Sequence, residues 1–414
     1  MTSFVVGAIL ASMTGAATLQ AQSPAVLAAS NSVIGGDADG SVFDRAVLSG
    51  QQADARATKY WVNAEYLLWR LNGSYLPSLV TASPLGTPVG SAGVLGRPGT
   101  EILFGNTDVN SAARSGGRLN AGYWFDCEQI SGIEVNFFML ESMTRNFVAG
   151  STGETILARP FFNTAIGRAD AELVAFPGIL NGSVAVTSSS GQLLGAGALF
   201  RQNLISWGCG NQFRLDGLVG YRYLHLGENL GIQENLTATD PFSRVPFGTS
   251  IIVNDRFDTR NDFHGGEVGL SADIRSGRWS LNVLGKIALG CTQTSMNIDG
   301  STLVSVPGAA PFGQSGGFLA QISNGGPHQA SHFSCVPELD VSLGYQLSAN
   351  CRITAGYTIL YWTRVARPGD QIDLAVNPNL LPPVMPGGDL HPAFPFRTSS
   401  LCVQGLSLGI AFRY

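Results

Sequence analysis

About ten segments of this 414-residue chain alternate between apolar and polar residues with a period of two. In 335–346, for example, Leu339, Val341 and Leu343 share one face, whereas Glu338 and Asp340 share the other. Successive side chains of a β-strand point to opposite faces, so this period indicates strands with one apolar and one polar face. The segments are 60–71, 115–126, 130–143, 193–207, 212–226, 262–275, 278–291, 335–346, 352–362 and 403–414.

The connections between these segments alternate between long and short. The long ones are 72–112, 144–192, 227–261, 292–334 and 363–401, and each short one has only a few residues. Soluble β-sandwiches also alternate in polarity, so alternation alone does not separate them from membrane barrels. Outer-membrane barrels, however, combine long loops outside with tight turns on the periplasmic side. The asymmetry of the connections therefore favours a barrel.

The composition excludes two other classes of protein. Charged residues make up 13% of the chain, about half of the usual 25% or so of soluble domains. After the N-terminus there is no run of about 20 apolar residues, which a helical membrane protein would need. Because lipid cannot satisfy exposed backbone groups, a sheet in a membrane must close on itself. We predict an all-β, closed antiparallel transmembrane β-barrel of about 10 strands (alternatively 12) in the cell outer membrane.

The final segment supports this location. From position 406 onward, one face of 403–414 carries only apolar and aromatic residues, and the segment finishes on an aromatic residue: Leu406, Leu408, Ile410, Phe412 and Tyr414. Such a strand resembles the terminal signature of barrels that are delivered to the outer membrane. At the other end, 4–19 is apolar and small, as in a secretory signal, although no basic residue precedes it. We therefore expect a signal peptide at 1–28, a flexible leader at 29–58 and the barrel at 59–414.

The polar face of the predicted strands carries charges of both signs, and in a barrel this face lines the lumen. The predicted lining residues are Glu65, Arg118, Glu134, Arg214, Asp216, Arg222, Glu267, Asp273, Lys286, Glu338, Asp340 and Arg352. A ten-stranded barrel is only modestly wider than the eight-stranded size that side chains fill, and wide diffusion pores have about 16 strands or more. Opposite charges in such a lumen can pair and plug it, so we expect at most a narrow channel.

Several landmarks of the chain resemble one protein family. The stretch 61–69 (WVNAEYLLW), followed by Pro77 and 79–81, resembles the opening of the planctomycete β-barrel porin family called beta barrel porin-7. The segments 96–105, 115–118, 122–125 and 220–224 strengthen the resemblance, which covers about 60–414. It implies an outer-membrane location. It transfers no functional residue.

Motifs that would indicate an enzyme or a cofactor site are missing. There is no phosphate-binding loop and no Cys-x-x-Cys pair. His328 and His332 are four residues apart, but they lie among glycine and proline, where no metal-binding helix is expected. We therefore predict no catalytic, cofactor or metal site. Of the six cysteines, Cys291 and Cys335 flank the predicted loop 292–334, so a disulfide between them would staple that loop.

Three functions remain compatible with this sequence. The first is a structural barrel or a narrow porin-like channel with a mixed-charge lumen. The second is an adhesin-like barrel that binds a partner through its long outer loops. The third is an enzyme at the outer rim, for which the candidate residues are His225, Asp255, Asp258, Asp262 and His264. Expected partners are outer-membrane lipid, the barrel-assembly machinery and small solutes. The net charge of −5 argues against nucleic acid.

Overall fold

A computed structural model describes residues 59–208, 212–381 and 388–414. The predicted signal peptide and leader, 1–28 and 29–58, lie outside the described residues. Among the residues that are described, no helix has both the length and the apolar character needed to cross a membrane.

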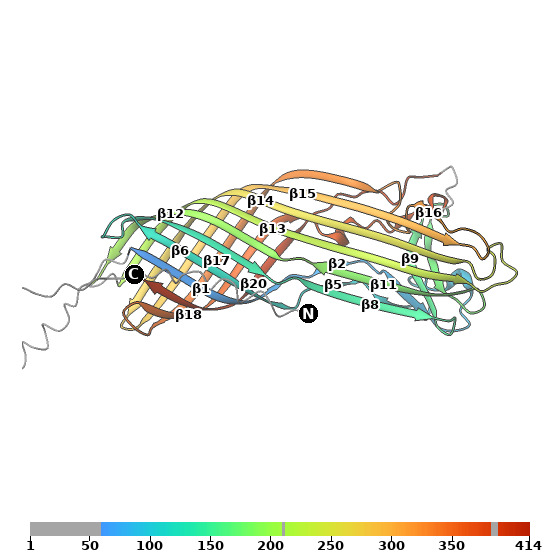
Figure 1. Cartoon of the computed structure of the whole chain (residues 1–414), viewed down its shortest axis with the longest axis horizontal. Helices are drawn as coiled ribbons and strands as arrows, with labels where there is room; N and C mark the ends of the chain where they lie inside the picture. Colours follow the sequence, from blue (N-terminus) through green and yellow to red (C-terminus); the bar gives the residue numbers. More distant parts are fainter. Residues whose placement is uncertain (1–58, 209–211, 382–387) are drawn as a thin grey trace, which may run out of the picture. The chain divides into compact units, whose positions relative to one another are not determined.

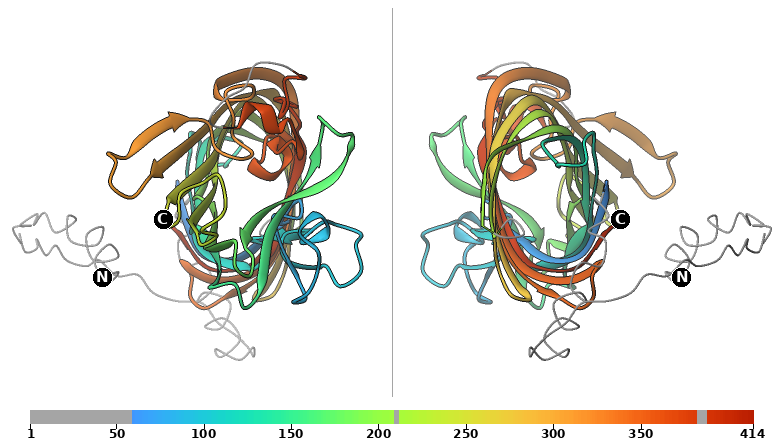
Figure 2. Two further views of the ribbon diagram at one scale, coloured as in Figure 1. Left: turned by 90° about the vertical axis from the view of Figure 1, so that its right-hand side faces the viewer. Right: turned by 90° about the vertical axis from the view of Figure 1, so that its left-hand side faces the viewer.

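Ten antiparallel strands form a closed ring (Figures 1 and 2). They are β1 (Tyr60–Leu71), β6 (Ala113–Trp124), β7 (Ser131–Leu140), β12 (Leu193–Trp207), β13 (Phe213–Ala238), β14 (Ser250–Ser276), β15 (Trp279–Ser305), β17 (Gly326–Gln346), β18 (Cys351–Val365) and β20 (Ser399–Arg413). Each strand pairs with the next one in this order, and β20 pairs with β1 from Trp61↔Arg413 to Leu71↔Val403. The prediction of a closed, ten-stranded antiparallel barrel is confirmed.

The outer face of the ring is apolar in the part next to the short turns. Val268, Leu270 and Ile274 on β14 are exposed, as are Leu339 and Leu343 on β17. The C-terminal strand shows the same pattern, since Leu406, Leu408 and Ile410 are also exposed on its outer side. Exposed aliphatic residues at every second position are typical of a face that contacts lipid.

Four strands continue far beyond the predicted boundaries. The regions 227–238, 250–261, 292–305 and 326–334, which we expected to be loops, are extensions of β13, β14, β15 and β17. Along these extensions the polarity is inverted: apolar side chains such as Phe257 face inward and are buried, whereas charged ones such as Arg256 face outward. The predicted strands were recognised by an apolar face that points outward. The extensions lack such a face, because water rather than lipid surrounds this part of the barrel.

The strand extensions and the long connections fold together into a lobe at the end opposite the short turns. We call it the outer lobe, and it comprises 72–112, 141–192, 227–261, 292–333, 366–381 and 388–400. Its further elements are β2 (Ser74–Leu76), β3 (Val80–Ser83), β4 (Glu101–Phe104), β5 (Thr107–Val109), β8 (Met143–Ser151), β9 (Ile156–Asn163), β10 (Arg168–Ala175), β11 (Leu180–Ser190), β16 (Phe312–Ser315), β19 (Ala375–Val376) and the 3-10 turns η1 (Val89–Ser91), η2 (Pro368–Gln371) and η3 (Pro378–Leu380).

The outer lobe has an apolar core of its own. β9 and β10 pair with β3 and β4 in a small sheet, and β8 and β11 extend the barrel wall beside β13. Leu157 and Phe161 of the small sheet pack in one buried cluster with Ile232 and Phe257 of the strand extensions. The long connections are therefore ordered because they bury apolar surface, which stabilises the lobe against the entropy of unfolded loops.

Candidate functional site

The inward-facing side chains of the ring enclose a cavity of about 210 Å³ at the short-turn end. Eleven of the twelve residues predicted to line the lumen do line this cavity: Glu65, Arg118, Glu134, Arg214, Asp216, Arg222, Asp273, Lys286, Glu338, Asp340 and Arg352. The twelfth, Glu267, is 1% exposed and accepts a hydrogen bond from Arg222. The period of two along each strand thus places these charges in one space.

In the deeper part of the cavity, each cation lies between two carboxylates. Arg118 pairs with Glu65 and, at 2.8 Å, with Asp340. Arg222 donates from Nη1 to Oε1 of Glu267 at 2.8 Å and also to Glu338. Because these groups are buried, their charges depend on one another for compensation. The Nζ atom of Lys286 is 3.4 Å from Glu267 and 3.6 Å from Glu338, so it joins the same network.

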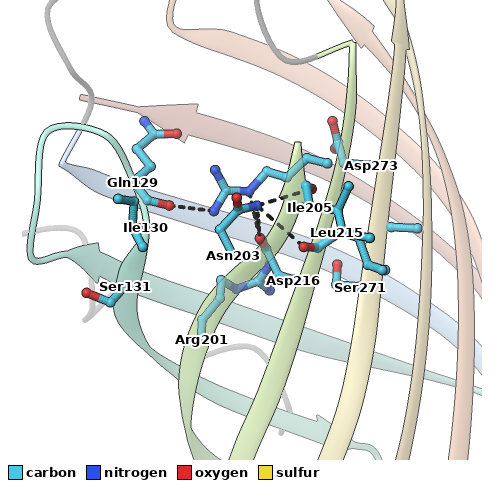
Figure 3. Close-up of polar contacts among 12 residues, drawn as sticks. Gln129, Ile130, Ser131, Arg201, Asn203, Ile205, Leu215, Asp216, Ser271 and Asp273 are labelled. Carbon is cyan, nitrogen blue, oxygen red and sulfur yellow. Dashed lines mark hydrogen bonds and ion pairs between the residues drawn. The ribbon is translucent and has the colours of Figure 1, made fainter. Parts of the chain in front are cut away.

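Near the short turns a second network links β12, β13 and the turn before β7. Arg201 donates to Glu134 at 2.6 Å and to Asp216 at 2.9 Å, and Asn203 donates to Asp216 at 3.0 Å. Arg214 pairs with Asp216 and donates to the carbonyl oxygen of Gln129 at 2.7 Å. Figure 3 shows Arg201, Asn203 and Asp216 directed toward one another inside the barrel wall.

Three further arginines line the cavity that were not among the predicted lining residues. They are Arg201, Arg275 and Arg413. Each occupies the inward face of its strand, two residues from another inward position such as Asp273 on β14. The period-two pattern places all three on the polar face of the predicted segments 193–207, 262–275 and 403–414, so the same signal that identified the other lining residues also applies to them.

Above the charged networks, an apolar layer crosses the lumen. We call it the lumen barrier, and nine of the ten ring strands contribute to it. Its residues are Leu67, Trp69, Leu71, Phe138, Leu140, Leu193, Leu224, Leu226, Phe263, Ala288, Val336, Leu360, Trp362, Val365, Leu401 and Val403. All are inside the ring and at most 4% exposed. Side chains that line an open aqueous channel would be exposed to water, so the lumen is filled at this level. This layer was not predicted, because only charged residues were assigned to the lumen.

Beyond the lumen barrier, the connection between β18 and β20 folds back into the ring. Arg367 forms two hydrogen bonds of 2.8 Å with Glu228, and Asn261 holds Ala366 through both its oxygen and its nitrogen. A Cβ atom on Gly369 would lie 2.0 Å from the carbonyl oxygen of Tyr75, so only glycine fits there. The left view of Figure 2 shows the orange-red turn η2 within the ring of strands. This segment closes the outer end of the barrel a second time.

A buried arginine in the outer lobe faces more carboxylates than it can neutralise. Arg159 on β9 pairs with Glu234 and, at 2.9 Å, with Asp255. Glu172 lies opposite Arg159 on β10, and its Oε2 atom is buried with no hydrogen-bond partner. Burial, together with repulsion by Glu234, raises the pKa of Glu172 well above its usual range, although Arg159 opposes the shift. The lobe therefore favours a protonated Glu172.

Of the residues proposed for a rim enzyme, His225, Asp262 and His264 lie together around Tyr223, whereas Asp255 and Asp258 have other partners. His225 Nδ1 is 2.8 Å from Asp262, and His264 Nδ1 is 2.5 Å from Tyr221, but these side chains lie on the outside of the barrel wall. Asp255 faces the interior, where it pairs with Arg159. Within 59–208, 212–381 and 388–414, no group of three histidine, cysteine or acidic residues is arranged to hold a metal ion.

The predicted disulfide is not formed. Cys291 and Cys335 are both free thiols. The register pairs Cys291 with Phe333 and Leu289 with Cys335, so the two cysteines are diagonal rather than direct neighbours. Diagonal positions are about 7–8 Å apart, whereas disulfides usually join Cα atoms about 4.4–6.8 Å apart.

We predict that Arg222→Met destabilises the folded barrel by about 3–5 kcal/mol, because it leaves Glu267 and Glu338 buried with less compensation. The midpoint of heat-induced unfolding, followed by gel migration of the detergent-folded protein, measures the change. Arg256→Met is the matched control, since the Arg256 side chain is 62% exposed and its ion pair with Asp258 is on the surface. Equal midpoints for the two variants would contradict a stabilising role of the lumen network.

We predict that Glu172→Gln stabilises the outer lobe at pH 8 but not at pH 5. A carboxyl group whose pKa is raised by folding contributes stability below its unfolded pKa and loses that contribution as the pH rises through its folded pKa. Glutamine remains neutral, so hydrogen exchange of β9 and β10, corrected for intrinsic rates, should slow several-fold at pH 8. Glu154→Gln, at an exposed position of the same lobe, should leave the rates unchanged. Equal hydrogen-exchange protection of β9 and β10 in the wild type and in Glu172→Gln at pH 8 would contradict the raised pKa of Glu172.

The chain has low-scoring similarities to several solved structures. Similar solved structures include the outer membrane protease OmpT from Escherichia coli (10% identity, TM-score 0.35, covering 88% of this chain and 99% of that one). A FadL homologue from Pseudomonas aeruginosa (8% identity, TM-score 0.21, 86% and 89%) and the toluene transporter TodX from P. putida (6% identity, TM-score 0.18, 86% and 89%) are also similar. No curated protein matches the chain significantly.

The family comparison covers the whole ring of strands. Residues 61–414 match the model of the family described as "Putative beta barrel porin-7 (BBP7)". This range begins within β1 and extends through β20, so it includes the seam that closes the barrel. The chain therefore belongs to the beta barrel porin-7 family and is an outer-membrane β-barrel protein.

Proposed function

We propose that this protein is a sealed structural barrel that anchors a folded outer lobe at the cell surface. The lumen barrier is the observation that carries the proposal. Two tryptophans from different strands, Trp69 and Trp362, are 1% and 0% exposed at its centre, and Phe263 packs against Trp362 with ring centroids 6.2 Å apart. Water and ions would have to displace these rings in order to pass.

The charged networks support a structural role for the same interior. Arg118, Arg222 and Lys286 each contact two carboxylates from other strands. Such contacts connect strands across the lumen. They do not leave free charges along an aqueous path. A narrow channel, the other form of the first hypothesis, would require both the lumen barrier and the segment 366–377 to move.

The outer lobe favours a role in surface interactions. It has a core of its own, and its exposed tips include Phe242, which is 95% exposed, and Leu390. In this proposal the barrel positions the lobe outside the membrane, where a partner can bind it. Outer-membrane lipid would contact the apolar band, and the barrel-assembly machinery would engage the C-terminal strand β20.

Enzymatic activity is not part of the proposal. The His225–Asp262 pair and His264 lie on the outside of the wall, and the cavity that the lumen does contain is lined by neither histidine. General acid–base chemistry requires a substrate within hydrogen-bond reach of the catalytic group. We therefore expect the rim histidines to be surface groups.

We predict that the folded wild-type protein produces no channel steps in planar lipid bilayers, because the lumen barrier excludes water. Conductance is expected only when both closures are opened, that is, when Phe263→Ala/Trp362→Ala, which removes two facing rings of the barrier, is combined with replacement of 366–377 by a flexible Gly-Ser linker. Trp279→Ala/Tyr345→Ala is the matched control: it removes a similar ring pair, 5.0 Å apart, at the short-turn end of β15 and β17, away from the barrier. Combined with the same linker, this control should produce no channel steps. Stable conductance steps from the wild type would contradict the sealed barrel.

A further inference from the structure

Positive charge accumulates at the periplasmic end of the lumen. The cavity lining contains eight basic residues and six acidic ones. In its deeper part, carboxylates match or exceed the cations, because Glu267 adds to Glu65, Glu338 and Asp340. The excess of positive charge therefore belongs to the part near the short turns. We call this part the basic mouth, and it contains Arg201, Arg214, Arg275, Arg352 and Arg413 facing Glu134, Asp216 and Asp273.

The carboxylates of the basic mouth are already engaged by some of its arginines. Glu134 and Asp216 bind Arg201 and Arg214. Asp273 binds Arg275 at 2.6 Å. These contacts leave Arg352 and Arg413 as the cations with the least compensation.

Arg413 has no close anionic partner. Among the described residues, no ion pair within 4 Å involves its guanidinium group. Arg352, Arg275 and Arg214 repel this group, and Asp273 attracts it. Arg413 is two residues beyond Ala411, the register partner of Arg352, so the two guanidinium groups project from adjacent strands into the same space. An uncompensated cluster of this kind is unfavourable unless an anion binds to it.

Arg352 also has unused hydrogen-bonding capacity. It is 8% exposed, its Nη1 atom is 3.6 Å from Asp273, and its Nε atom is buried with no hydrogen-bond partner. Arg201 likewise has a buried Nε atom with no partner. Buried donors are normally satisfied, so these orphaned donors, on arginines whose side chains line the cavity, indicate that the basic mouth lacks an acceptor.

The dimensions of the cavity limit the size of that acceptor. Its volume of about 210 Å³ is below the range of roughly 300–1,000 Å³ that is typical of pockets for drug-sized ligands. The lumen barrier closes the cavity on the outer side, so a ligand enters and leaves from the periplasm. Guanidinium groups form forked hydrogen bonds with oxyanions, which a halide ion cannot match.

We propose that the basic mouth binds a small multivalent oxyanion of the phosphate class between Arg352 and Arg413. The anion compensates the excess positive charge and accepts hydrogen bonds from both guanidinium groups. Arg275 stays paired with Asp273, whose negative charge disfavours a deeper position of the anion. The source of the phosphate group is either inorganic phosphate or a small phosphate monoester in the periplasm.

Isothermal titration calorimetry of the folded full-length protein in detergent, in phosphate-free buffer, tests this site. We expect inorganic phosphate to bind saturably at one site, with chloride at the same ionic strength giving no saturable heat. Arg413→Gln and Arg352→Gln should each weaken phosphate binding at least tenfold, whereas Arg413→Lys retains part of it. Arg256→Gln, on the outside of the outer lobe, should bind as the wild type does. Glycerol phosphate in a parallel titration distinguishes the two sources: tighter binding than phosphate identifies a monoester.

Heat-modifiable gel migration establishes that each variant is folded before titration. Absence of saturable phosphate binding to the wild type would overturn the proposal. So would wild-type affinity in folded Arg413→Gln and Arg352→Gln, or a loss of equal size in Arg256→Gln. The outcome is separate from that of the bilayer experiment, because an oxyanion can occupy the basic mouth whether or not the lumen barrier ever opens.

Discussion

The hydrogen bonds of the polypeptide backbone determine the architecture of this protein. Within a bilayer there is no water to satisfy a free strand edge, so every N–H and C=O group of the spanning strands needs a partner in the sheet. The pairing of β1 with β20 provides this by joining the first and last ring strands over eleven consecutive register positions, from Trp61↔Arg413 to Leu71↔Val403. With no free edge, the outer face needs only to be apolar, and the interior is available for other interactions.

Polarity then varies along the barrel axis as well as across its wall. On β13, the inward side chains change from Arg214 and Arg222 to Leu224 and Leu226, and beyond Glu228 to Leu230 and Ile232. Charged layers therefore alternate with apolar layers inside the same ring. Each charged layer is satisfied by ion pairs between strands, and each apolar layer excludes water from its neighbours. This alternation stabilises a narrow barrel from within, which is consistent with the proposed structural role.

The strands that contact lipid could be predicted because lipid imposes one rule on all of them. β1 and β12 have the predicted boundaries of 60–71 and 193–207, and most predicted lining residues do lie around one cavity. The upper halves of β13 and β14 were missed because water surrounds them, so that Phe257 faces inward and Arg256 outward, opposite to the pattern in the membrane.

The lumen barrier could not be found from periodicity alone. Leu224 occupies the same strand face as Arg222, so its inward direction was implied, but a single leucine on a polar face has little weight. Only the register of all ten strands shows that Leu224, Phe263 and Trp362 meet at one level. The role of Arg413 was hidden for a similar reason, since its neighbour Arg352 is adjacent only through the pairing of β18 with β20.

The closing seam between β1 and β20 is the feature to test most directly. In a variant whose six native cysteines are replaced by serine, Tyr66→Cys and Leu408→Cys would occupy directly opposed positions, where Cα atoms about 4.5–5.5 Å apart permit a disulfide. Oxidation of the folded protein should join this pair and change its migration on a non-reducing gel, whereas Tyr66→Cys with Leu343→Cys, on the non-adjacent strand β17, should remain unlinked. Failure of the Tyr66–Leu408 pair to form a disulfide in the folded protein would contradict a closed barrel.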